Sequence, residues 1–136
     1  MNSNVKMNTY ELNALSRQVV LAAIEVHRTM GPGLLERVYE DCLMEEFEIR
    51  NIKALRQVNV PLEYKGKKLH SNYVIDILVD NEIVVELKAV EEIHPVFEAQ
   101  LLSYLKLADK RLGFLLNFNV NVMKNGINRF VNGIGH

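Results

Sequence analysis

The sequence predicts an α/β fold in which helices flank a mixed β-sheet. Apolar residues recur at helical spacing in three segments, and shorter apolar runs stand between and after these segments. Three of the runs follow one another before the last helix, and another run comes after it. Consecutive strands followed by a helix and a further strand are typical of a mixed sheet with helices packed on it.

The first two elements are expected to be helices. Apolar side chains one turn apart predict a helix over residues 12–30, and Gly31-Pro32-Gly33 ends it because glycine and proline break helices. A second helix is expected over 34–50, with Glu36 at the edge of its apolar arc and therefore facing the protein. The acidic residues outside that arc are expected to form a solvated face: Glu40, Asp41 and Glu48.

The remaining elements are strands interrupted by one helix. Two strands are expected over 55–64 and 69–79, joined by the turn Lys65-Gly66-Lys67, and a third over 82–90. A helix over 95–109, a strand over 112–118 and a short last strand over 127–131 complete the expected order. The chain of 136 residues has the size of one compact domain, so we expect a single domain over 1–136.

Composition narrows the class of protein. The segment MNSNVKMN has no apolar stretch of the kind that a signal peptide needs, and no apolar run is long enough to span a membrane. Cys42 is the only cysteine, which fits a reducing compartment, so we expect a cytoplasmic protein. The net charge of −1 argues against binding to nucleic acid through bulk charge, although not against a local basic patch.

Charged residues interrupt two strands that are otherwise apolar. Asp76 stands at the centre of one run, and Glu86 and Lys88 stand within IVVELKAV. Side chains alternate along a strand, so Glu86 and Lys88 point to the same face. Buried charges are costly unless they are paired or bind a metal. The plainer alternatives are a half-exposed ion pair for Glu86 and Lys88, and backbone hydrogen bonds for Asp76.

The length of the loop after Asp76 decides whether the two acids meet. A two-residue loop at Asp80-Asn81 would pair Asp76 with Val85 and turn the acids to opposite faces. A three-residue loop over 80–82, or one bulge, would pair Asp76 with Glu86. We expect the second register, because it brings the acids together where a cation can neutralise them.

Two neighbouring carboxylates point to a divalent metal. They raise each other's pKa unless a cation lies between them, and oxygen ligands of this kind suit Mg²⁺ or Mn²⁺. Such a metal activates water and stabilises charge on a phosphate. Lys88 would orient or deprotonate the water or hold the phosphate, and Gln100 and Tyr104, which share a helix face, would support the substrate or the lysine.

These residues resemble the PD-(D/E)XK nuclease superfamily, whose signature is an acid on one strand and E-x-K on the next. Asp76 and the run Glu86-Leu87-Lys88 fit this signature, and the run from Gln100 to Tyr104 is similar to the Q-x-x-x-Y motif of RecB-type members. The segment GLLERVY, residues 33–39, resembles the motif of the GxxExxY proteins, a small branch of the superfamily. The resemblance covers residues 12–131 and implies a restriction-endonuclease-like core.

The resemblance also implies roles for individual residues. It implies metal ligands at Asp76 and Glu86, a catalytic Lys88, a supporting or water-mediated role for Glu36, and a site-lining role for Gln100 and Tyr104. Two positions depart from the family pattern: Val74 stands where a basic residue is frequent, and Phe97 where a histidine is frequent. Each departure would remove a phosphate contact and leaves the metal ligands in place.

Two functions follow as hypotheses. The first is a Mg²⁺- or Mn²⁺-dependent nuclease that hydrolyses phosphodiester bonds, with DNA favoured over RNA and a homodimer as the expected assembly. Four lysines are candidates for contacts with the phosphate backbone: Lys65, Lys67, Lys68 and Lys106. The alternative is an inactive module on the same fold that binds nucleic acid or a protein partner. Glu36 also has a plain alternative, since an acid in the first turn of a helix is favourable without any function.

Overall fold

A five-stranded mixed sheet forms the centre of the computed structural model, which describes residues 5–133. The strands are β1 (Ala54–Tyr64), β2 (Lys67–Val79), β3 (Ile83–Lys88), β4 (Leu112–Asn117) and β5 (Ile127–Val131), and they lie in that order across the sheet. β3 and β4 are parallel, and the other neighbouring pairs are antiparallel. The expected mixed sheet is therefore confirmed.

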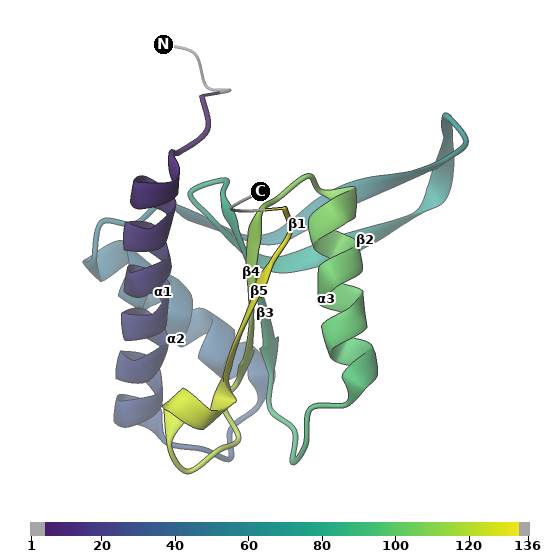
Figure 1. Cartoon of the computed structure of the whole chain (residues 1–136). Helices are drawn as coiled ribbons and strands as arrows, with labels where there is room; N and C mark the ends of the chain where they lie inside the picture. Colours follow the sequence, from purple (N-terminus) through teal and green to yellow (C-terminus); the bar gives the residue numbers. More distant parts are fainter. Residues whose placement is uncertain (1–4, 134–136) are drawn as a thin grey trace.

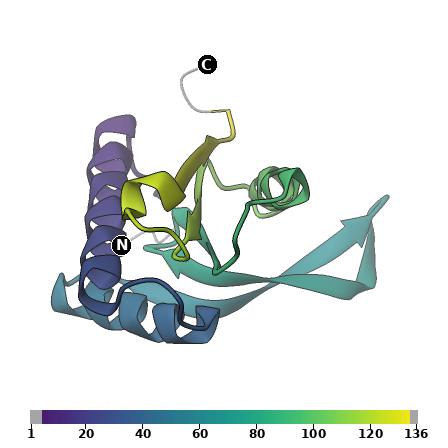
Figure 2. The same ribbon diagram turned by 90° about the horizontal axis from the view of Figure 1, so that it is seen from below.

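Helices cover both faces of this sheet. The helices are α1 (Thr9–Met30), α2 (Glu36–Ile49) and α3 (Pro95–Leu107), and a short 3₁₀ helix, η1 (Met123–Gly126), precedes β5. Figure 1 and Figure 2 show α1 and α2 on one side of the sheet and α3 on the other. The core accordingly has two clusters of buried apolar side chains, one beneath α1 and α2 and one beneath α3. In the described part of the chain, no helix combines the length and the apolar character that crossing a bilayer requires.

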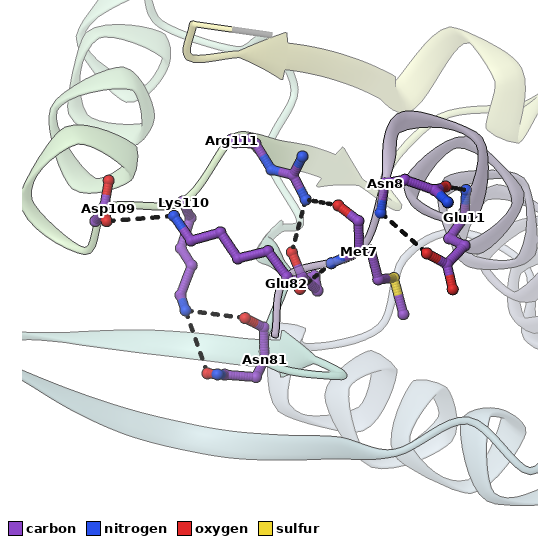
Figure 3. A network of polar contacts seen from close by, with 9 residues as sticks. Met7, Asn8, Glu11, Asn81, Glu82, Asp109, Lys110 and Arg111 are labelled. Atoms are coloured by element: carbon purple, nitrogen blue, oxygen red, sulfur yellow. Dashed lines mark hydrogen bonds and ion pairs between the residues drawn. The ribbon is translucent and has the colours of Figure 1, made fainter. Parts of the chain in front are cut away.

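Polar contacts fix the start of α1 to one end of the sheet. Asn8 caps the helix by accepting a hydrogen bond from the Glu11 backbone N–H at 2.8 Å, and the Glu11 side chain accepts one from Asn8 in return. Arg111, just before β4, donates to the Met7 carbonyl at 2.7 Å and to Glu82 at 3.2 Å (Figure 3). This network lies where β3 and β4 begin, so it attaches the start of α1 to the sheet there. Glu86 and Lys88 lie at the other end of β3.

The hairpin of β1 and β2 leaves the sheet partway along its length. Figure 1 and Figure 2 show its tip extending past α3 into solvent. Ile77 packs beneath α1 and α2, whereas Ile75 packs beneath α3, although residues two apart in a regular strand share a face. The change of face occurs at Asp76 and at Gln57 on β1, which lie between the pairs Arg56–Ile77 and Val58–Ile75. Gln57 has a left-handed backbone with φ 53°, a conformation that is uncommon for residues other than glycine.

Candidate functional site

The loop between β2 and β3 brings the two acids together. Val79 pairs with Ile83, and the ladder ends at the pair Ile77–Val85. The loop therefore has three residues, 80–82, and the expected register, which sets Asp76 opposite Glu86, is confirmed.

The side chain of Asp76 takes the place of a backbone acceptor where β2 and β3 stop pairing. Its Oδ2 accepts a hydrogen bond from the Leu87 backbone N–H at 2.9 Å. β3 itself continues beside β4 as far as Lys88. The backbone contact that was the plain alternative for Asp76 is thus present.

Glu86 is the most unusual group in this part of the protein. Its Oε1 is buried and has no hydrogen-bond partner among the described residues. Burial, and then the neighbouring negative charge of Asp76, raise the pKa of Glu86 to about 9. The pKa of Asp76 is also raised, chiefly by burial, against the opposing effect of the Leu87 N–H. At neutral pH the two carboxyls therefore retain a proton between them unless a cation takes its place.

Lys88 lies on the same side of β3 as Glu86 but rests on an aromatic ring. Its Nζ is 4.1 Å from the centre of the Phe97 ring, a cation–π contact. Among the described residues it forms no ion pair with an acid. The departure from the family pattern at Phe97 thus has a structural consequence, because the ring holds the ammonium group from the α3 side.

Gln100 and Tyr104 line the same small cavity as this lysine. The cavity has a volume of about 120 Å³ and lies between β3 and α3, with these lining residues: Val74, Glu86, Lys88, Phe97, Gln100, Leu101, Tyr104 and Leu115. Burial, and then the charges of Glu86 and Asp76, raise the pKa of the Tyr104 hydroxyl. The shared helix face predicted for Gln100 and Tyr104 therefore faces the E-x-K segment of β3.

Glu36 lines a second cavity together with Asp76, whereas Glu86 and Lys88 line the first. The second cavity has a volume of about 640 Å³ and these lining residues: Glu36, Arg37, Glu40, Asp41, Arg56, Gln57, Asp76 and Leu87. Partial burial of its carboxyl group raises the pKa of Glu36, with Asp76 and Glu40 adding to the effect and Lys88 opposing it. The residue as a whole is exposed, which corrects the expectation that it faces the protein interior. It is the first residue of α2, so no preceding helical turn covers it.

Glu40 was expected on a solvated face, and that expectation is wrong. Its exposed fraction is 7%, and it accepts hydrogen bonds from Arg56 Nε at 2.9 Å and Gln57 Nε2 at 2.8 Å. Glu40 lies outside the apolar arc of α2, but β1 covers this flank of α2 with polar side chains. Two adjacent polar residues near the start of the first predicted strand, Arg56 and Gln57, were the signal that could have found the contact.

Two buried polar residues position the segments around the site. The Tyr39 hydroxyl donates to the Gly31 carbonyl at 2.6 Å and accepts from the Leu34 N–H at 3.1 Å, which fixes the turn leading into Glu36. Asn117, at the end of β4, donates to the Val90 carbonyl at 2.9 Å and accepts from the N–H of the same residue at 3.1 Å. The chain after Lys88 is therefore held at the edge of the site. Sequence reasoning did not identify this role of Asn117.

The acids fit a divalent cation that keeps much of its own hydration. Within residues 5–133, no group of three or more His, Cys, Asp or Glu side chains has the arrangement of a complete metal cage. Mg²⁺ binds through one or two carboxylates and completes its shell with water and substrate phosphate. Asp76 and Glu86 supply such a pair, and the unpartnered Oε1 of Glu86 is an oxygen that a cation would satisfy.

The fold and these residues agree with the family comparison. A family model described as the PD-(D/E)XK nuclease superfamily matches residues 13–130, a span that runs from α1 into β5. No curated protein and no solved structure matches the chain. Members of the superfamily are generally nucleases, so the match supports a nuclease-type function with nucleic acid as the substrate. The chain belongs to the PD-(D/E)XK nuclease superfamily.

Proposed function

We propose that this protein is a divalent-metal-dependent nuclease that hydrolyses phosphodiester bonds, with Asp76 and Glu86 as the ligands of Mg²⁺ or Mn²⁺. The observation that carries the proposal is the buried Oε1 of Glu86, which lacks a hydrogen-bond partner next to a second acid. Such a group costs free energy in the folded protein. A cation would relieve this cost, which explains why the acids stand in a buried strand.

Lys88 is the residue that we assign to the reacting water and phosphate. When bound, the cation would lower the pKa of an attacking water and stabilise negative charge on the phosphate. The ammonium group of Lys88 would donate hydrogen bonds that orient the water or hold a phosphate oxygen. Its position over Phe97, 4.1 Å from the ring centre, keeps it beside the cavity that Glu86 also lines.

Three further residues surround this centre. Glu36, at the N-terminus of α2, would act on the cation through a water or directly, since its cavity also includes Asp76. Gln100 and Tyr104 would contact the substrate or support Lys88 from α3. The spacing of Gly33, Glu36 and Tyr39 supports placing the chain in the GxxExxY branch.

Cleavage assays with matched variants test the proposal. Wild type, Lys88→Ala and Lys124→Ala are incubated with single- and double-stranded DNA and RNA in the presence of Mg²⁺, Mn²⁺ or EDTA. Lys124 is an exposed lysine of η1 and controls for the loss of one surface charge. We expect cleavage by wild type and Lys124→Ala that needs metal, and a loss of at least about 100-fold in Lys88→Ala. DNA is the polymer that we expect to be cut.

A measurement of metal binding distinguishes a protein that has the metal site but does not cleave from one that is not a metal-dependent nuclease. Isothermal titration with Mn²⁺ is expected to show binding by wild type that Asp76→Ala loses. If wild type cleaves none of the polymers and binds no metal, the nuclease assignment fails, and a binding module on an inherited fold becomes the better account. Metal binding without cleavage would overturn the catalytic step and leave the assignment of the ligands standing.

A further inference from the structure

The outer part of the β1–β2 hairpin extends from the candidate site into solvent. We call residues 58–74 the hairpin arm. The arm begins next to Asp76 and Gln57, where the hairpin changes face, and it ends at the turn around Gly66. Figure 1 and Figure 2 show it reaching past α3, away from α1 and α2. The root of the arm is therefore part of the candidate site, and its tip is remote from it.

Packing against α3 fixes the direction of the arm near its root. The rings of Tyr73 and Tyr104 are stacked with their centres 4.0 Å apart, and the Tyr73 hydroxyl donates to the Tyr104 carbonyl at 2.8 Å. Apolar side chains of β1 add to this contact beneath α3: Val58, Val60 and Leu62. Because its root is anchored, the arm presents its tip at a defined distance from the acids.

The tip of the arm is basic although the protein as a whole is not. Lys65, Lys67 and Lys68 are exposed, and among the described residues none of them forms an ion pair. Glu63 is the one acid within residues 58–74, in a chain whose net charge is −1. The exposed ring of Tyr64 lies beside Lys65, whose Nζ is 5.4 Å from the ring centre. Positive charge is thus concentrated at the tip of an arm that projects from the body.

We propose that the tip of the hairpin arm binds the phosphate backbone of a double-stranded nucleic acid whose scissile phosphate lies at the candidate site. The assignment of the scissile phosphate rests on the proposed nuclease function. Exposed lysines without acidic partners suit phosphates, because their binding releases counterions from the nucleic acid. A second copy of the chain is a less suitable partner, since the tip is charged and polar rather than apolar.

The length of the arm favours a duplex over a single strand. Ten residue steps separate Asp76 from Gly66, and at roughly 3.3 Å per step they extend over about 33 Å. One turn of a DNA duplex measures about 34 Å. A rigid duplex at the site therefore presents a phosphate near the tip, whereas a flexible single strand has no phosphate at a fixed distance.

Salt-dependent binding, measured without metal, tests the arm apart from cleavage. Wild type, the triple variant K65Q/K67Q/K68Q and the control K6Q/K53Q/K124Q are titrated with a labelled duplex of about 24 base pairs in EDTA over a range of salt concentrations. The control removes the same charge from three exposed lysines outside the arm. We expect the slope of log K against log salt to fall by about 2 to 3 in the arm variant, and affinity at low salt to fall more than tenfold, with little change in the control.

Binding to a shorter duplex and the oligomeric state of the variants show whether the proposed role of the arm is wrong. A duplex of about 8 base pairs, which is about 27 Å long, should reduce the difference between wild type and the arm variant, because it cannot contact the site and the tip at the same time. Equal slopes for the three proteins, or no binding by wild type, would overturn the role of the arm. A change in sedimentation of the arm variant without a change in slope would instead indicate self-association. Failure of metal-dependent cleavage would count against the nuclease function, not against arm-dependent binding.

Discussion

Replacing Glu86 with glutamine is expected to stabilise the metal-free protein at neutral and alkaline pH, although it removes a proposed metal ligand. Burial and the charge of Asp76 raise the pKa of Glu86 from 4.5 to about 9 in the folded protein. Between these two values the folded state holds a proton that the unfolded state has released. The stabilising effect of this proton is therefore complete below about pH 4.5 and is lost as the pH rises toward 9.

The size of the loss in stability follows from the one extra proton that the folded state holds. One excess proton in the folded state lowers the free energy of unfolding by about 1.4 kcal/mol for each unit of rising pH. Between pH 6 and pH 8 wild type should thus lose roughly 3 kcal/mol, or on the order of 10 °C in Tm for a domain of this size. Asp76, whose pKa is also raised, contributes in the same direction. Glutamine does not titrate, so the variant should lose much less.

Denaturation in EDTA at the two pH values measures this difference. Urea titrations of wild type, Glu86→Gln and Glu91→Gln give the free energies of unfolding, and Glu91 serves as an exposed acid close in sequence. We expect the control to follow wild type. The same pH dependence in wild type and Glu86→Gln would show that Glu86 carries no raised pKa and would refute the reasoning. Mn²⁺ at 100 times its Kd should stabilise wild type by about 2.7 kcal/mol and leave Glu86→Gln unchanged.

Three further substitutions test contacts around the site. Glu40→Ala should lower the free energy of unfolding in urea titrations by about 1 to 3 kcal/mol, because Gln57 loses its acceptor and Arg56 keeps only Asp41. Glu48→Ala, at an exposed position of α2, should change it by less than about 0.5 kcal/mol. Tyr39→Phe removes a buried hydroxyl that bridges two backbone groups, so a loss of about 1 to 3 kcal/mol is expected, and an unchanged Tm would contradict the contact. Gly126→Ala would place a Cβ against the Asn117 carbonyl oxygen, and a fall in stability of at least about 1 to 3 kcal/mol should appear in thermal melts.

The order of the elements and the residues of the proposed metal site could be predicted from the sequence. Periodicity placed the helices and strands within a few residues of their observed bounds, including the short β5 at Ile127–Val131. Asp76 and Glu86 were identifiable because charge within an apolar strand is costly, and that cost can be judged without a structure. The loop register followed from the same cost, since a two-residue loop would turn the acids to opposite faces, whereas the three-residue loop over 80–82 lets them meet.

The surroundings of those acids could not be predicted, because they depend on packing between distant segments. Glu40 is buried because β1 packs polar groups on α2, and a helical arc drawn for α2 alone contains no information about β1. The exposure of Glu36 likewise depends on where α2 begins. The hairpin leaves the sheet at Asp76 because both of its strands change face there, and strand periodicity describes each strand without its twist relative to the sheet. The pattern of residues within a segment therefore identifies the chemical groups of the site. Packing between distant segments determines how exposed these groups are and in which direction the hairpin arm points.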